Sequence, residues 1–128
     1  MNLNQLLLPL LLLSPLALIA EEPKIYLAAT ETAALIAKEG QKVTVYGNTE
    51  GSGKSSSGMN FVNFKGAQFY LVTFQSDLTQ FPDGEPADVV DGKRIAVEGA
   101  SSIHRDKPQI KLTRPDQVSI LEAEEVYP

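Results

Sequence analysis

The hydrophobic pattern of the chain changes its period at Gly40, and this change limits the folds open to it. Residues 30–39 carry alanine, leucine and isoleucine at helical spacing. We expect Thr30 as the N-cap, Glu31 in the first turn and Gly40 in the left-handed position that ends a helix. From Lys42 onward apolar and polar residues alternate and β-branched residues are frequent, which is typical of strands. The sequence therefore predicts one short helix followed by β structure.

Five strands are expected after this helix, at residues 42–47, 60–65, 68–75, 93–103 and 109–113. Residues 66–67 join the second and third strands as a hairpin, residues 76–81 form a short helix, and residues 117–121 extend the fifth strand. Residues 50–58 are expected to be a flexible loop, and residues 82–91 a solvated acidic loop. This order predicts an all-β domain with a small α contribution, a five-stranded Greek-key OB-fold barrel with an N-terminal helix.

The amino-terminal segment has the pattern of a signal peptide. Residues 6–20 are uncharged and almost entirely apolar, and this run is shorter than the roughly 18–20 residues that span a bilayer. Ala20 precedes a polar stretch and is a plausible cleavage point, although no Lys or Arg stands before the run. We therefore expect a signal peptide at 1–20, a linker at 21–29, the domain at 30–121 and an acidic tail at 122–128. A periplasmic or secreted location follows, with no stable membrane span after cleavage.

Composition excludes several classes of protein. The chain has 128 residues and a formal net charge of −5, so it is not a protein that is basic throughout. It has no cysteine and one histidine, which excludes disulfides, thiolate metal sites and multi-histidine metal centres. The charge is uneven, because residues 77–91 carry five acids and no base whereas residues 93–114 carry six bases and two acids. A local site for an anionic ligand is therefore compatible with the acidic total.

Several segments in sequence order resemble OB-fold domains of the tRNA-anticodon-binding-like type. Residues 40–48 (GQKVTVYGN) resemble the opening strand of that family, and residues 60–64 (NFVNF) its second strand. Residues 91–99 (DGKRIAVEG) are similar to its fourth strand, while residues 107–110 (KPQI) and 113–118 (TRPDQV) are similar to its endings. The resemblance covers about residues 30–121. It implies a nucleic-acid-binding OB-fold, although OB-folds also bind oligosaccharides and proteins.

One position departs from the family's pattern. Asp106 stands where members often carry glycine, which leaves the conformation of the turn at residues 104–108 open. Aspartate tolerates turns well.

The candidate binding residues fall on the expected second and third strands and on two loops. Alternation places Val62 and Phe64 toward the core and the neighbouring residues outward, and we assign Phe69 and Phe74 to the core. For Phe61 and Tyr70 the core and the binding face are equally expected, and bases stack on aromatic rings. Cationic side chains on the loops and on the fifth strand could contact phosphates. The candidate ligand-binding residues are Lys54, Phe61, Asn63, Lys65, Tyr70, His104, Arg105, Lys107 and Lys111.

Three other motifs are set aside. Residues 51–55 (GSGKS) look like a phosphate loop, but the required glycine is one position off and no helix follows. The acidic residues between 77 and 91 lack the ligand spacing of a calcium loop. No Ser/His/Asp arrangement is recognisable, so we expect no enzyme activity, no metal and no cofactor.

Two functions remain open from the sequence. The first is a secreted or periplasmic domain that binds single-stranded DNA or RNA through the face of strands two and three and the loops beside it. The alternative is an interaction module for an envelope protein or an oligosaccharide with no role in nucleic-acid binding. The acidic net charge and the expected compartment favour the alternative, whereas the aromatic and basic residues favour the first.

Overall fold

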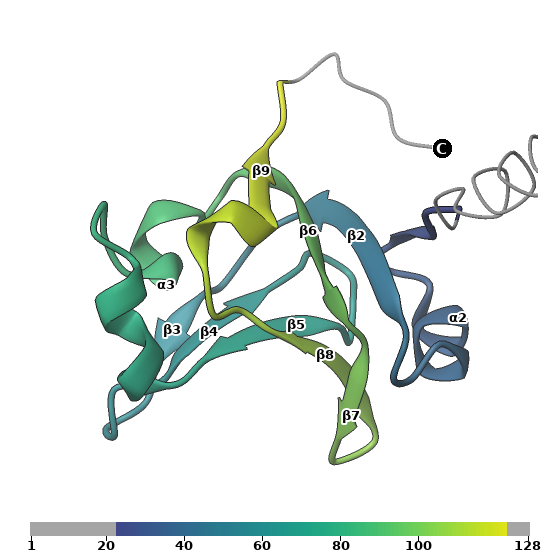
Figure 1. Cartoon of the computed structure of the whole chain (residues 1–128), viewed down its shortest axis with the longest axis horizontal. Coiled ribbons are helices and arrows are strands. Elements are labelled where there is room, and N and C mark those ends of the chain that lie inside the picture. Colours follow the sequence, from purple (N-terminus) through teal and green to yellow (C-terminus); the bar gives the residue numbers. More distant parts are fainter. Residues whose placement is uncertain (1–22, 123–128) are drawn as a thin grey trace, which may run out of the picture.

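The alternating segments of the sequence form short strands in residues 23–122, the part of the chain that the computed structural model describes (Figure 1). The fold is all-β with a small helical contribution, as predicted. The strands are β1 Tyr26–Ala28, β2 Lys42–Asn48, β3 Gly53–Lys54, β4 Asn60–Asn63, β5 Tyr70–Thr73, β6 Arg94–Ala100, β7 Ser102–His104, β8 Lys107–Lys111 and β9 Val118–Ile120. The helices are α2 Thr32–Ala37 and α3 Pro86–Val89, with 3₁₀ helices η1 Gln75–Gln80 and η2 Pro115–Gln117.

The described strands form two sheets, in the orders β1-β2-β6-β9 and β3-β4-β5-β8-β7. The hairpin of β4 and β5 is antiparallel, as predicted, whereas β5 and β8 are parallel. Within residues 23–122 the strands therefore form two sheets and not a closed barrel. The sheets meet at an isolated bridge between Thr49 and Phe64 and where the chain passes from β6 into β7.

Ser101 is the reason that the expected strand at 93–103 is broken. Its backbone bonds both to Gly40 and to Gln41, and its hydroxyl donates to the carbonyl of Leu35 at 2.9 Å. These bonds tie the residue to the end of α2 rather than to a neighbouring strand. The chain consequently leaves the first sheet after β6 and enters the second as β7, as Figure 1 shows.

Three further expectations differ from the structure. Helix α2 is shorter than predicted, and its N-cap is Glu31 rather than Thr30, without a side-chain capping bond. Residues 117–121 do not extend the fifth strand, because η2 turns the chain so that β9 pairs antiparallel with β6. Strand β1 lies within the segment expected to be a linker and pairs in parallel with β2. The left-handed conformation at Gly40, with φ of 83°, agrees with the sequence.

The core lies between the two sheets and under α2. Its fully buried members include Leu35, Phe69, Ile95 and Ile110, and Val62 and Phe64 face it as predicted. Phe74 was assigned to the core and that assignment is wrong, since the residue is 37% exposed. The cause is local: Phe74 follows the last residue of β5 and is the N-cap of η1, so its side chain leaves the sheet where the chain turns.

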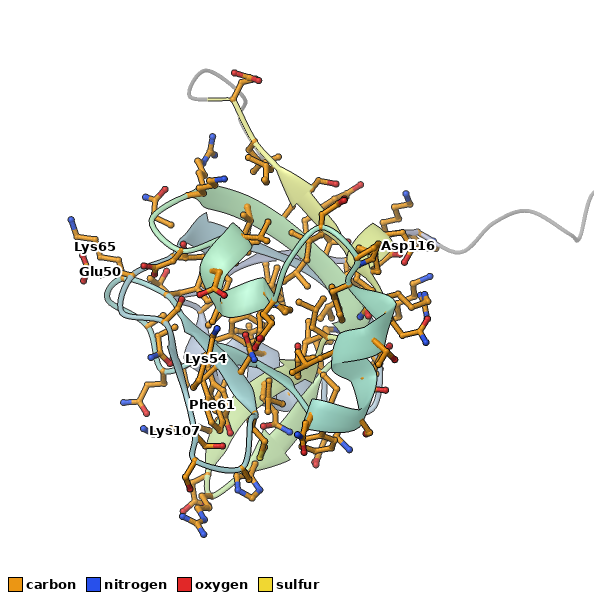
Figure 2. All side chains as sticks on the ribbon, turned by 90° about the vertical axis from the view of Figure 1, so that its left-hand side faces the viewer. Glu50, Lys54, Phe61, Lys65, Lys107 and Asp116 are labelled. Carbon is orange, nitrogen blue, oxygen red and sulfur yellow. The ribbon has the colours of Figure 1, made fainter. Side chains whose placement is uncertain are left out.

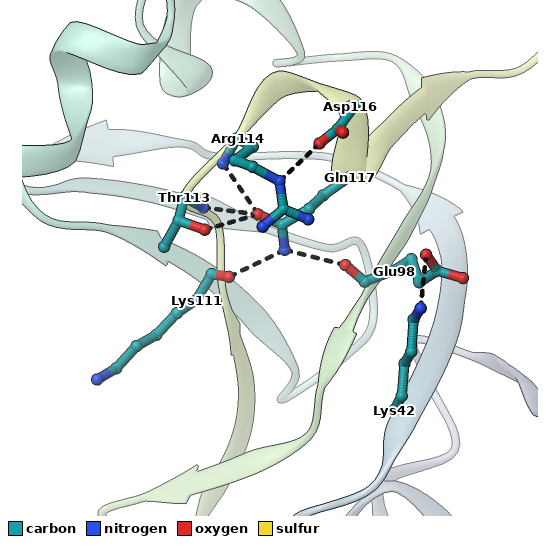
Figure 3. Close-up of polar contacts among 7 residues, drawn as sticks. All are labelled: Lys42, Glu98, Lys111, Thr113, Arg114, Asp116 and Gln117. Carbon is teal, nitrogen blue, oxygen red and sulfur yellow. Dashed lines mark hydrogen bonds and ion pairs between the residues drawn. The ribbon is translucent and has the colours of Figure 1, made fainter.

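The segment after β8 is held by the side chain of Gln117 (Figure 3). Its amide oxygen accepts from the backbone of Thr113 and Arg114 and from the Thr113 hydroxyl, at 2.7, 3.0 and 3.1 Å. Its amide nitrogen donates to the carbonyls of Glu98 in β6, at 3.0 Å, and Lys111 in β8, at 3.2 Å. One side chain therefore links η2 to a strand of each sheet, which explains the glutamine in the motif at residues 113–118.

The expected signal peptide at 1–20 and almost all of the acidic tail lie outside the described residues. Within residues 23–122, none of the helices has the length and apolar character needed to cross a bilayer.

Candidate ligand-binding groove

An open groove of about 1000 Å³ runs over the outward face of the second sheet. Val72 of β5 and Gln109 of β8 are buried and form its floor. Phe61 of β4 and Tyr70 of β5 are half-buried and stand along it. The groove exists because alternate residues of β4 and β5 point away from the core, as period-2 alternation requires. Of the residues that alternation placed outward, Phe61 and Asn63 thus share one concave surface.

The aromatic side chains are arranged as a platform rather than as a closed cluster. The rings of Phe61 and Tyr70 have centroids 6.3 Å apart and are inclined by 47°. Phe74 also lines the groove, and the ammonium group of Lys111 lies 4.9 Å from its ring centroid. Partly exposed rings of this kind can stack with a planar ligand, because each still has a face open to solvent.

The hairpin of β7 and β8 supplies the cations on one side of the groove. His104 pairs with Lys107, so Arg105 and Asp106 form a two-residue turn, and both have positive φ values of 50° and 67°. Such turns match the twist of the strands, and aspartate tolerates the left-handed region, which settles the conformation that the sequence left open. His104, Arg105 and Lys107 line the groove.

The positive charge of Arg105 in this hairpin acts on the hydroxyl group of Tyr70. Burial raises the pKa of the Tyr70 hydroxyl above its ordinary value, and the nearby positive charge of Arg105 opposes that rise. The phenol therefore remains protonated at neutral pH and can donate a hydrogen bond into the groove.

Lys54 lines the groove at the opposite side but is ion-paired. Its ammonium group donates to Asp88 of α3 at 2.7 Å and lies 3.5 Å from Glu85. The hydrogen bond that the Lys54 ammonium group donates to Asp88 is the largest cause of a raised Lys54 pKa, and desolvation opposes this rise. A ligand phosphate must therefore compete with two carboxylates for this cation.

The same contacts correct two expectations about loops. The segment 50–58 contains β3 and is anchored, because the backbone N–H of Ser52 donates to Asp91 and the Asn63 amide donates to the carbonyl of Gly51. The segment 82–91 contains α3 and is attached to β4 through the buried side chain of Asn60. Proline at the first helical position, Pro86, is the signal that could have predicted α3.

The structure brings together seven of the nine candidate residues. Lys54, Phe61, Asn63, Tyr70, His104, Arg105 and Lys107 line the groove. Figure 2 shows Lys54, Phe61 and Lys107 in one region, with Lys65 apart from them near Glu50. Lys111 does not line the groove but lies against Phe74 at its margin. The groove is also lined by residues that the sequence did not single out for binding, among them Met59, Gln68, Phe74 and Gln109.

The groove differs in charge from the chain as a whole. Its ionisable lining residues are Lys54, Tyr70, His104, Arg105 and Lys107, and none of the residues that line it is acidic. The chain carries a formal net charge of −5. Within residues 23–122, no group of three or more His, Asp or Glu side chains is placed to hold a metal ion. The chemistry available in the groove is therefore stacking, hydrogen bonding and the binding of anions.

Comparison with known proteins gives a limited resemblance. No protein-family model and no curated protein matches the chain. Among solved structures, it is similar to an aspartyl-tRNA synthetase from Leishmania major Friedlin, with a TM-score of 0.49 and 9% identity over 80% of this chain and 21% of that one. It is also similar to aspartyl-tRNA synthetase from Entamoeba histolytica, with a TM-score of 0.49 and 11% identity over 84% of this chain and 27% of that one. The chain thus spans only about a fifth to a quarter of those chains.

Proposed function

We propose that residues 30–121 form an OB-type domain that binds single-stranded nucleic acid in the groove over the second sheet. The order of strand pairing supports the OB assignment. Strand β4 pairs with β5, β5 lies parallel to β8, β8 pairs with β7, and β6 returns to β2. Counting β6 and β7 as one bent strand, this is the five-stranded connectivity of a partly open Greek-key barrel.

One observation carries the ligand assignment. In a chain of net charge −5, the groove contains aromatic rings and cations and no acid. A ligand that suits such a surface has flat apolar faces and regularly placed negative charges, and single-stranded nucleic acid has both. Base stacking on an aromatic ring contributes about 1–3 kcal/mol. The roles follow: Phe61 and Tyr70 stack with bases, and Arg105 and Lys107 bind phosphates.

The cations of the groove are not equally available to a ligand phosphate. Arg105 and Lys107 have no carboxylate partner among the described residues, so they are the main phosphate contacts. Lys54 contributes only where a phosphate displaces Asp88. We assign this protein a binding role without catalysis or cofactor, because nothing in the groove combines a nucleophile with a base.

The proposal includes export of the chain. Residues 6–20 have the length and apolar character of a signal-peptide core. Amino-terminal sequencing of the protein recovered from the outside of producing cells tests this, and a mature chain beginning at Glu21 is expected. Recovery of the uncleaved chain in the cytoplasm would contradict it.

The groove is tested by fluorescence anisotropy with labelled single strands of about 12 nucleotides, a length within the range that OB-folds cover. Both DNA and RNA are titrated with the full chain, with a duplex of equal length as comparison. Binding should weaken as salt rises, with a slope in log–log form of roughly −0.7 for each phosphate contacted. The double change Arg105→Gln and Lys107→Gln should reduce that slope by about 1.4.

A matched control separates local contacts from net charge. Lys42 is exposed on β2, in the first sheet, and Lys42→Gln should leave the slope unchanged. Phe61→Leu should weaken binding at every salt concentration without altering the slope, because stacking is not ionic. Absence of binding at low salt to both DNA and RNA would refute the proposal and leave the alternative of a protein- or oligosaccharide-binding module.

A further inference from the structure

A second concave surface lies away from the groove, between the α3 segment and the last strand. It has a volume of about 170 Å³ and is lined mainly by apolar side chains, among them Phe81, Val89, Leu112, Val118 and Ile120. Apolar cavities of about 150 Å³ hold a benzene molecule, so this pocket can accept one large apolar side chain. It shares no lining residue with the groove.

The strand register explains why the pocket exists. Val118 pairs with Val97, and Ile120 with Ile95. Residues opposite each other on paired strands point to the same face of the sheet, so Val118 and Ile120 point to the core side. Val97 and Ile95 are fully buried there, whereas Ile120 is 53% exposed. The apolar face of the first sheet therefore continues past the part of the core that residues 81–90 cover.

The outer edge of this pocket is strand β9, whose side away from β6 pairs with no other strand of residues 23–122. Strand β9 is the last in the order β1-β2-β6-β9, and it stands at the top of the fold in Figure 1. The N–H of Leu121 bonds inward to the carbonyl of Arg94. Backbone groups alternate in direction along a strand, so the N–H and C=O of Ile120 point outward. An extended peptide can add to such an edge and place alternate side chains beside it.

Charge indicates what kind of peptide fits. The wall of the pocket opposite β9 belongs to residues 81–90, where Glu85 and Asp88 are ion-paired with Lys54 and Asp83 gives the wall its negative charge. Asp83 lines the pocket and is its only ionisable lining residue. An extended segment that alternates apolar and basic residues would place its apolar side chains toward the pocket and keep its cations near this acidic wall.

We propose that β9 and the pocket beside it form a docking site for an extended basic segment of a partner protein, which adds to β9 as a strand and inserts an apolar side chain between Val89 and Ile120. This site is independent of the groove and of its proposed ligand. Its chemistry is opposite, since the groove suits an anion and this site suits a cationic chain.

The test uses nitrogen-15-labelled full chain and a capped peptide of about eight residues in which lysine and valine alternate, long enough for a strand. The expected result is a set of amide chemical-shift changes in residues 81–90 and 118–120. Ile120→Ser should weaken the peptide at least about fivefold, because an exposed apolar contact is removed from the pocket. Ile36→Ser, at an isoleucine 36% exposed on α2, is the matched control and should leave the affinity unchanged.

Two further peptides test the mechanism. A peptide alternating glutamate and valine should bind much more weakly, because it meets the acidic wall with like charge. The lysine–valine peptide N-methylated on the residues facing β9 should also bind weakly, because it cannot donate to the strand edge. If either peptide binds as well as the original, the proposal is wrong.

Other outcomes would also overturn it. Unchanged affinity in Ile120→Ser would mean that the peptide is held by the acidic segment alone. Shift changes confined to the groove would place the peptide there. If deletion of residues 123–128 by itself produced the same shift changes, the pocket would belong to the chain's own carboxyl-terminal segment. An absence of any shift change at millimolar peptide would exclude the site.

Discussion

Replacing Gln117 by glutamate should destabilise the domain far more than a change of one atom suggests. The three bonds accepted by the side-chain oxygen can persist in the variant. The two bonds donated by the amide nitrogen to Glu98 and Lys111 cannot, because a carboxylate has no hydrogen to donate. An oxygen would instead face two carbonyl oxygens at about 3 Å.

The magnitude follows from these contacts. Each lost hydrogen bond costs about 0.5–1.5 kcal/mol, and the unpaired carbonyls and their repulsion by the carboxylate add to that, so we expect a loss of about 2–3 kcal/mol in the free energy of unfolding. For a domain of this size, 1 kcal/mol corresponds to about 4–8 °C in Tm, which predicts a decrease of roughly 10–20 °C. The chain has no tryptophan, so thermal and urea unfolding are followed by far-UV circular dichroism.

The pH dependence makes the test sharper. The carbonyl environment raises the pKa of the introduced carboxyl in the folded state above the ordinary glutamate value of about 4.3. The folded state therefore favours the protonated form, so the destabilisation is smallest below that value and grows as pH rises through the folded-state pKa. Gln41→Glu, at an exposed glutamine, is the control. A Tm for Gln117→Glu that equals the control at neutral pH would refute the reasoning.

Three further predictions concern the groove and the sheets. Asp88→Asn should raise the affinity for a single-stranded oligonucleotide roughly two- to fivefold, because it frees Lys54 from its nearest carboxylate and removes one exposed like charge; anisotropy measures it. Gly99→Ala should cost about 1–3 kcal/mol in unfolding free energy, because the new methyl group would meet a side-chain carbon of β8 at 2.7 Å. Arg105→Gln should raise the Tyr70 pKa further above 10.0, because it removes the charge that opposes the effect of burial; ultraviolet titration of the tyrosines measures it. Because the folded-state pKa of Tyr70 is raised, the stability it contributes is complete below the unfolded value and is lost as pH rises through the folded value.

The first two of these predictions each have a control. Asp116→Asn removes an exposed carboxylate that is paired with Arg114, outside the groove lining, and should leave oligonucleotide affinity unchanged. Gly53→Ala has no atom within 4 Å of the new methyl group and should leave Tm within a degree or two. Equal effects of Asp88→Asn and Asp116→Asn on affinity would show that net charge, not the Lys54 contact, is responsible.

Local pattern was sufficient for the strands that lie in the middle of the fold. The alternation at residues 60–65 correctly placed Val62 and Phe64 toward the core, because one face of this segment is buried and the other is not. The hairpin at Gly66 and the left-handed Gly40 followed from turn chemistry in the same way.

The pattern was insufficient where a residue acts through distant partners. Ser101 reads as an ordinary strand residue, yet its bonds to Leu35 and Gln41 end β6 and send the chain into the other sheet. Phe74 has the composition of a core residue, but its position at the start of η1 exposes it. Neither the bonds of Ser101 nor the exposure of Phe74 could be predicted from the residues next to them in the sequence.

The residues of the candidate groove were likewise only partly predictable from the sequence. The sequence indicated which side chains could bind an anionic, planar ligand, and the tertiary structure decided which of them meet. Lys65 and Lys54 were equivalent as sequence features, but one lies apart from the groove and the other is ion-paired with Asp88 at its edge. The sequence left Phe61 and Tyr70 equally open to the core and to the binding face, and the tertiary structure places both along the groove.

The sequence by itself determined the all-β class, the inward residues Val62 and Phe64 and the basic turn between β7 and β8. Only the tertiary structure decided that the acidic segment neutralises Lys54, that β9 joins β6, and that an apolar pocket opens beside it. The physical reason is the separation along the chain of the residues that interact. Period and turn preference are local, whereas ion pairs, sheet edges and pockets depend on segments that meet only after the chain has folded.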